Sequence, residues 1–240
     1  MTSANTRART LRILTATLKG GSAKTTTAVL LAIALARKGL RVVLICADTT
    51  NRGAARWTQR AVNRSYEIPY VFLEWEPALG QLPRFAKAAE AEHEADVVIV
   101  DMGGEKAEFF THGCLWAGWL ISPVSPVDGE LDSIGPTYLA AATVSEARAV
   151  GLVHSVLLAR CPQVGKGMAA KARTELEKDL RDAAGNPDPE IPWSVGAHVF
   201  TAEITRGAAY SDFYGHIPDD VGEYAALANE ILTLRIEVDL

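Results

Sequence analysis

The sequence predicts an α/β fold: a doubly wound, mostly parallel sheet of about seven or eight strands flanked by helices. Short apolar runs alternate with helical patterns along almost all of the 240 residues, which is typical of a parallel sheet covered on both faces. The runs VVLI at 42–45 and VVIV at 97–100 are too apolar for half-exposed strands. Both are therefore expected near the centre of the sheet.

The individual elements follow from these periodicities in chain order. Strands are expected at 11–17, 41–46, 69–73, 96–101, 118–122, 153–159 and 197–201. Helices are expected at 24–38, 52–63, 82–94, 130–148, 168–184 and 222–236. No internal repeat is visible, and the one stretch with linker composition, GNPDPEIPW at 185–193, reads as a surface loop. We therefore expect a single domain over 1–240, with a flexible tail at 1–10.

The composition narrows the classes of function. A formal net charge of −5 excludes a polycation, so any binding of nucleic acid requires a local basic face. The three cysteines Cys46, Cys114 and Cys161 form no C-x-x-C pair, which argues against a zinc site and favours a reduced, cytoplasmic setting. The apolar helix after Lys24 is interrupted at Arg37 too early for a membrane span, so no membrane partner is expected.

A candidate phosphate loop lies between the first strand and the first helix. Gly20 and Gly21 allow the backbone to approach a phosphate, and the helix that follows directs free N–H groups and its dipole at the anion. In such a loop Lys24 contacts the β- and γ-phosphates and the hydroxyl of Thr25 binds Mg²⁺. The alternative is a strand–turn–helix joint with a surface lysine. The whole candidate set is Lys19, Gly20, Gly21, Ser22, Ala23, Lys24, Thr25 and Thr26.

The segment KGGSAKTT at 19–26 resembles the deviant Walker A motif K-G-G-x-x-K-[ST] of the ParA/MinD ATPases. The resemblance implies a P-loop NTPase fold and ATP as the nucleotide. It also implies that Lys19 is the signature lysine, which in that family reaches across a dimer interface to the partner's nucleotide. Two facing triphosphates concentrate negative charge that such a lysine offsets. Ala23 stands where the family usually has glycine, and its methyl group is tolerated where φ is negative.

Two aspartates extend the resemblance, each at the carboxyl end of an expected strand, where ligands of doubly wound sheets bind. The resemblance implies that Asp48 orients the attacking water, although Asp48 would also serve as the cap of the following helix. Asp101 is implied as the Walker B carboxylate that holds Mg²⁺ with Thr25. Asp101 to Gly104 fits D-x-x-G, in which a glycine N–H senses the γ-phosphate. Cys46 replaces a frequent first aspartate.

What the resemblance implies about function is a ParA-like ATPase of plasmid or chromosome partition. ATP would close a sandwich homodimer on nonspecific double-stranded DNA at the nucleoid, and a ParB-type adaptor would stimulate slow hydrolysis. Arg206 is the foremost DNA-contact candidate, followed by Lys171 and Arg173. Further basic residues of the same half are Arg148, Arg160, Lys166 and Lys178. Acidic residues are interleaved with them, so a solvated helix face is the alternative.

Three other functions remain open at this point. A MinD-like positioning ATPase shares the motif, but the short acidic C-terminus offers no basic membrane helix. A biosynthetic ATP-dependent enzyme can share the fold, but such enzymes lack the signature lysine matched by Lys19. A family member that binds nucleotide and hydrolyses it poorly is suggested by Ala23 and Cys46.

Overall fold

The computed structural model describes residues 9–19, 23–104, 107–163, 167–207, 210 and 212–238. Most of the tail expected at 1–10 lies outside these ranges. Within it, Thr10 is tied to the body of the protein, because its hydroxyl donates a hydrogen bond to the carbonyl of Ala95 at 2.9 Å.

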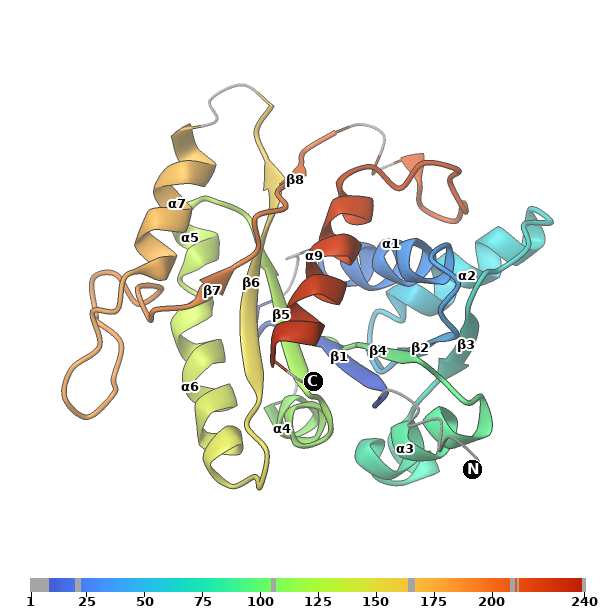
Figure 1. Cartoon of the computed structure of the whole chain (residues 1–240), viewed down its shortest axis with the longest axis horizontal. Coiled ribbons are helices and arrows are strands. Elements are labelled where there is room, and N and C mark those ends of the chain that lie inside the picture. Colours follow the sequence, from blue (N-terminus) through green and yellow to red (C-terminus); the bar gives the residue numbers. More distant parts are fainter. Residues whose placement is uncertain are drawn as a thin grey trace, which may run out of the picture.

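The predicted fold class is confirmed: the chain forms an eight-stranded sheet in the order β3-β2-β4-β1-β5-β6-β7, with β8 paired to β6 (Figure 1). All seven pairings between these strands are parallel. The strands are β1 (Leu11–Thr15), β2 (Val42–Cys46), β3 (Val71–Glu74), β4 (Val97–Asp101), β5 (Trp119–Val124), β6 (Val153–Cys161), β7 (His198–Val199) and β8 (Ile204–Thr205). As predicted, the runs at 42–45 and 97–100 are fully buried.

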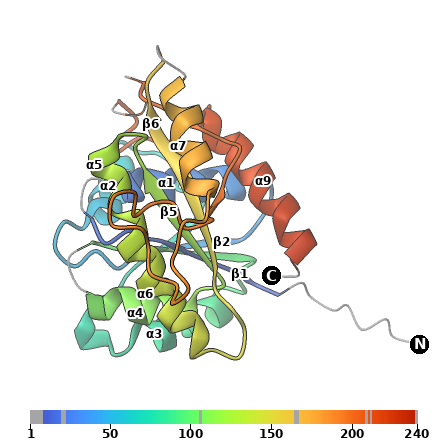
Figure 2. The same cartoon turned by 90° about the vertical axis from the view of Figure 1, so that its left-hand side faces the viewer.

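Helices cover both faces of the sheet (Figure 1). They are α1 (Lys24–Ala36), α2 (Gly53–Asn63), α3 (Leu82–Glu92), α4 (Ala107–Trp116), α5 (Asp128–Leu131), α6 (Ile134–Glu146), α7 (Gly167–Glu177) and α9 (Glu223–Val238), with a 3-10 turn, η1, at Pro77–Leu79. Helices α1, α2 and α9 share one core with the sheet, and α3, α4 and α6 contribute to the core on the opposite face. In the second view α7 lies alongside the long strand β6 (Figure 2).

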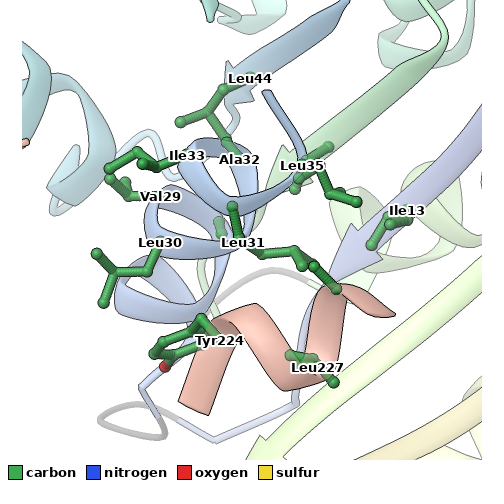
Figure 3. Close-up of a cluster of buried hydrophobic side chains, with 14 of the residues drawn as sticks. Ile13, Val29, Leu30, Leu31, Ala32, Ile33, Leu35, Leu44, Tyr224 and Leu227 are labelled. Carbon is green, nitrogen blue, oxygen red and sulfur yellow. The ribbon is translucent and has the colours of Figure 1, made fainter. Parts of the chain in front are cut away.

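Helix α1 is held between the sheet and α9 (Figure 3). Leu31 and Leu35 belong to the same buried cluster as Ile13 of β1 and Tyr224 and Leu227 of α9. Because apolar side chains surround the helix on every side, it has no polar face, and its position is fixed by packing. Like the other helices in the described ranges, it does not combine the length and the apolar character needed to cross a membrane.

Several expected boundaries are wrong. The helix expected at 130–148 is two helices, α5 and α6, because Pro136 has no N–H and is tolerated only in the first turn of α6. Helix α7 ends at Glu177 rather than 184, since the backbone beyond it bonds instead to the loop before β7, as in Leu180 N–H to Ser194 O at 2.9 Å. Helix α4 and the two-residue strand β8 have no counterpart in the expectation.

Candidate functional site

The strand order brings the carboxyl ends of β1, β2 and β4 together. Strand β4 lies between the other two, with Asp101 in register with Thr15 on one side and Cys46 on the other. Asp101 therefore lies between the loop that follows β1 and the loop that carries Asp48 after β2. In folds of this kind, ligands usually bind outside the carboxyl ends of the strands, at the point where the strand order reverses.

The candidate phosphate loop joins β1 to α1 in this place, although Gly20, Gly21 and Ser22 lie outside the described residues. On either side of them, the Nζ of Lys24 donates to the carbonyl of Lys19 at 2.8 Å, which closes the loop. The first turn of α1 holds no acidic residue and its N-cap gives no side-chain hydrogen bond. The positive end of the helix dipole therefore points at the loop without a negative side chain in its first turn, which favours an anion there.

Ala23 adopts the left-handed conformation, with φ of 61° and ψ of 16°. The condition under which its methyl group is tolerated, a negative φ, is therefore not met. A non-glycine residue in this region costs about 1–2 kcal/mol. The carbonyl of Ala23 still accepts the first helical hydrogen bond, from the N–H of Thr27 at 2.9 Å. The loop thus keeps a turn suited to glycine, and the alanine strains it.

Thr25 and Asp101 meet at the end of the sheet. The Thr25 hydroxyl donates to Oδ2 of Asp101 at 2.9 Å, while Oδ1 is buried and has no hydrogen-bond partner among the described residues. Asp101 is only 1% exposed, and burial raises its pKa to about 7, with the nearby Asp48 carboxylate adding to the shift. A buried carboxylate oxygen without a partner is costly, so this atom is suited to a cation.

The donor set at this point fits Mg²⁺. No cluster of three or more His, Cys, Asp or Glu side chains suited to a metal occurs in the described ranges. Mg²⁺ does not require one, because it is usually held by one or two protein oxygens together with substrate phosphates and water. The hydroxyl of Thr25 and the carboxylate of Asp101 are such oxygens, and they lie at the start of the helix that receives the phosphates.

Lys24 and Cys46 set the charge at this edge of the sheet. Lys24 is 8% exposed, and burial lowers the pKa of its ammonium, against the attraction of Asp101 and Asp48. Burial raises the pKa of the Cys46 thiol to about 12, so the thiol is neutral where the family often has an aspartate. The site therefore combines a desolvated cation with fewer carboxylates than the family pattern implies, and an anion would replace the hydration that Lys24 has lost.

Asp48 lies between the start of α2 and the segment after β4. Its Oδ1 accepts the N–H groups of Thr50 at 3.1 Å and Asn51 at 2.8 Å, so the carboxylate does order the approach to α2. On the other side, a Cβ placed on Gly103 would lie 2.9 Å from the same oxygen. The N-cap of α2 is Arg52, without a side-chain cap hydrogen bond, so Asp48 orders the turn before the helix rather than capping it. The water-orienting role stays a prediction.

Two glycines follow Asp101 for steric reasons. A Cβ on Gly104 would lie 3.0 Å from the carbonyl oxygen of Lys19 and 3.1 Å from that of Thr17. Gly103 is crowded by Asp48 in the same way. The chain after β4 therefore runs directly against the phosphate loop, as the D-x-x-G interpretation of Asp101 to Gly104 requires.

Lys19 lies at the exposed rim of the site. Its side-chain amine donates to the carbonyl of Gly129 in α5 of the same chain. The contact is with a neutral acceptor, so the positive charge of Lys19 is not neutralised by it. Its role toward a partner subunit stays a prediction.

A cavity of about 700 Å³ opens beside the loop, and the sequence analysis did not anticipate it. Ala23 and Thr26 line one side, and Arg160 and Arg206 line another. Aromatic side chains complete the wall: Trp57, Tyr210, Tyr214 and Tyr224. Its size and mixed lining suit the nucleoside part of a ligand whose phosphates lie in the loop. The signal available in the sequence was the aromatic run at 210–214.

The basic residues expected to contact DNA differ in their neighbours: one lines the cavity, and two are bonded to nearby carbonyl or carboxylate groups. Arg206 lines this cavity. Arg173 donates to the carbonyl of Phe200 at 2.7 Å and to Glu203 at 2.9 Å, and Lys171 pairs with Glu175 at 3.6 Å. Lys166 lies outside the described residues. The DNA role of Arg206, Lys171 and Arg173 stays a prediction.

A strand, a glycine-bearing loop with a buried lysine, and a helix whose threonine meets a strand-end aspartate define a phosphate-loop nucleotide-binding protein. Comparison with known families agrees. The chain belongs to the family described as the CobQ/CobB/MinD/ParA nucleotide binding domain, whose model matches residues 13–157. The predicted ParA/MinD relationship is thereby confirmed. No curated protein sequence matches the chain.

Solved structures share the fold over nearly the whole chain. Apo McdA from Cyanothece aligns with a TM-score of 0.67 and 14% identity, over 93% of this chain and 100% of that one. A putative plasmid partition protein from Borrelia burgdorferi B31, bound to AMPPNP, gives 0.65 and 12%, over 96% and 100%. Cobyrinic acid a,c-diamide synthase from Mycobacterium smegmatis, with ADP and magnesium, gives 0.62 and 16%, over 95% and 96%. These identities establish the fold alone.

Proposed function

We propose that the chain is an Mg²⁺-dependent ATPase of the ParA type that serves the partition of a plasmid or chromosome. ATP closes a sandwich homodimer, the dimer binds double-stranded DNA without sequence preference, and a ParB-type adaptor stimulates hydrolysis. The observation that carries the proposal is the contact between Thr25 and Asp101 beside the phosphate loop, with one buried carboxylate oxygen left for a cation. The fold shared with the Borrelia partition protein supports the same role.

The side chains around the loop have distinct tasks in binding ATP. Lys24 gives its desolvated ammonium to the β- and γ-phosphates, together with the positive end of the α1 dipole. Thr25 and Asp101 would hold Mg²⁺, which neutralises charge on the phosphate oxygens. The cavity lined by Arg160 and Arg206 receives the nucleoside.

Hydrolysis requires a group that orients water at the γ-phosphate. Asp48 is suited to this task because two backbone N–H groups fix its carboxylate and Gly103 leaves it room. Lys19, at the exposed rim, supplies its charge to the nucleotide of the partner subunit. Because that contact exists only in the closed dimer, ATP favours the dimer over the monomer by differential binding.

The state of association tests the proposal most directly. The protein is sized by light scattering with ATP and Mg²⁺, with ADP and Mg²⁺, and each with and without duplex DNA. A dimer with ATP, a monomer with ADP, and DNA binding that depends on ATP and falls steeply with salt are expected. A monomer in both nucleotides, or equal DNA binding in both, contradicts the proposal. Binding to anionic vesicles in place of DNA would indicate a positioning ATPase instead.

Charge reversal locates the DNA surface. Lys171→Glu is expected to weaken ATP-dependent DNA binding with unchanged affinity for ATP, and Arg206→Glu to weaken both, because Arg206 also lines the cavity that receives the nucleoside. Lys87→Glu on α3, which packs on β2 and β4 rather than beside β6 and β7 as α7 does, is the matched control. Loss of DNA binding in all three variants, or in none, contradicts the assignment of these residues. The proposed DNA binding implies that the protein is associated with the nucleoid in the cytoplasm.

A further inference from the structure

A groove of about 780 Å³ lies between α2 and the sheet edge at β3, and the proposed ATPase cycle makes no use of it. Its floor is apolar and aromatic, with Ile68, Tyr70 and Phe72. Val62 of α2 lines the groove and is 50% exposed. The groove is therefore recessed, with an apolar base open to solvent.

Arginines form a row along one side of α2. Arg56 and Arg60 of α2 line the groove four residues apart and so share one face of the helix, and Arg52, directly before the helix, lines the groove as well. Among the described residues lining the groove, Glu74 is the only carboxylate, and it pairs with Arg52. The row therefore carries a net positive charge.

The other two arginines of the row have no carboxylate partner among the described residues. Arg60 stacks over the ring of Tyr214, 4.8 Å from its centroid, so its position is fixed while its charge stays available. Arg56 is exposed and has no ion pair within the part of the chain that the structure describes. The groove therefore offers two cations to an anionic ligand.

The strand beside the groove has a free edge. Among the described strands β3 is the last in the sheet order and pairs only with β2. The backbone N–H of Trp75, which follows β3, points toward β2 and donates to the carbonyl of Cys46 at 2.9 Å. Alternate residues of a parallel strand face the same neighbour, so the N–H and C=O groups of Phe72 and Glu74 point away from β2. An extended peptide can hydrogen-bond there by adding a strand.

The spacing of the arginines on α2 matches the spacing of side chains along a strand that would add to β3. Side chains four residues apart on a helix are separated by about 6 Å along its axis. Side chains on one face of an extended strand recur about every 6.7 Å. A strand added to β3 would place every second side chain toward α2, so acidic residues in alternation would meet Arg56 and Arg60. Its backbone would meanwhile bond to Phe72 and Glu74.

We propose that the groove between α2 and β3 binds an extended acidic segment of a partner protein, which adds as a strand to β3 and places alternate carboxylates on Arg56 and Arg60. The recessed apolar floor and the free strand edge favour a peptide over a nucleic acid. The phosphates of a nucleic acid would contact protruding cations, but they would bind neither the apolar floor nor the strand edge. The surface needs no bound nucleotide, so the proposal stands apart from the ATPase cycle.

The test uses the full chain without nucleotide and a fluorescein-labelled peptide in which Glu and Val alternate. Fluorescence anisotropy is expected to show salt-sensitive binding, weakened about tenfold or more by Arg56→Glu. Arg84→Glu, an exposed arginine of α3, is the matched control and should leave the affinity unchanged. Far-UV circular dichroism verifies that both variants are folded.

Two further measurements test the added strand. The amide protons of Phe72 and Glu74 should exchange more slowly when the peptide is bound, and N-methylation of alternate peptide residues should abolish this protection and the binding. Equal affinity of the wild type and Arg56→Glu, or of the plain and N-methylated peptides, overturns the proposal. So does a duplex DNA that binds through Arg56 while the peptide does not compete, since the row would then be a nucleic-acid surface.

Discussion

Asp48 and Gly103 are packed so closely that a Cβ on the glycine would lie 2.9 Å from Oδ1 of the aspartate. The same oxygen accepts two backbone N–H groups in the turn before α2, so the carboxylate has little freedom to move aside. Gly103 therefore acts as a spacer between the end of β4 and the residue proposed to orient water.

Gly103→Ala is expected to slow hydrolysis without weakening ATP binding. The new methyl group displaces the Asp48 carboxylate, and a misplacement of this size costs about tenfold to a hundredfold in kcat. Affinity for ATP should stay within about twofold, because Lys24 and Thr25 are not touched. Steady-state hydrolysis and calorimetric titration measure the two quantities. Gly167→Ala is the matched control, since a Cβ there meets nothing within 4 Å. A normal kcat in Gly103→Ala would remove Asp48 from the reaction.

Ala23→Gly is expected to stabilise the protein in the absence of nucleotide. The left-handed φ of 61° at this residue strains an alanine but not a glycine, and the gain outweighs the greater entropy of glycine in the unfolded chain. The net effect on the free energy of unfolding should be about 0.5–1 kcal/mol in urea.

The control for this substitution is Ala170→Gly on the exposed side of α7, where the helical conformation makes glycine destabilising by about 0.5–1 kcal/mol. If both variants lost stability equally, the turn at Ala23 would not be strained.

Asp101 should make the stability of the protein depend on pH. Its pKa is about 7 when folded, against about 3.9 in an unfolded chain, so the folded state holds the proton more tightly. The stabilising contribution is complete below the unfolded pKa, falls as pH rises from about 4 to 7, and is lost above the folded value. Between pH 5 and 7, the wild type should lose roughly 1 kcal/mol per pH unit relative to Asp101→Asn.

Urea unfolding of both proteins at several pH values measures this difference. Binding of Mg²⁺ and nucleotide near pH 6 should also release a proton from Asp101, which appears as a dependence of the binding enthalpy on the buffer. Parallel stability curves for the two proteins would mean that Asp101 is already ionised in the free protein.

The sequence was informative about the fold because the sheet is buried on both faces. Uninterrupted β-branched runs such as those at 42–45 and 97–100 leave no alternative to central strands, and the strand order then places Asp101 beside the phosphate loop. Two elements, β8 and α4, have no comparable pattern in the sequence. Strand β8 has two residues, and α4 is apolar on several sides, so its pattern does not distinguish a helix from a buried connection.

The candidate site divides in the same way. Lys24 and Thr25 were predicted because the phosphate-loop motif is local in sequence, and Asp101 because it ends an apolar strand, although it lies 76 residues from Thr25. The backbone angle at Ala23 and the crowding of Gly103 and Gly104 depend on which segments meet in space. The cavity proposed for the nucleoside is also assembled from distant parts of the chain, with Arg160 and Tyr214 brought to Thr26 only by the fold.

Lys19→Ala should separate nucleotide binding from dimer formation. Among the described residues the Lys19 amine donates to the neutral carbonyl of Gly129, whereas Lys24 is the buried cation proposed to hold the phosphates of its own nucleotide. Removing Lys19 therefore leaves the affinity of the monomer for ATP within about twofold, but it removes the charge that each subunit supplies to its partner. Sizing with ATP should show a monomer, with hydrolysis and DNA binding lost together.

Lys38→Ala, just beyond the far end of α1, is the matched control and should dimerise normally. An ATP-dependent dimer of Lys19→Ala that still turns over would show that the lysine serves its own subunit, and the loop would then be an ordinary phosphate-binding loop acting in the monomer.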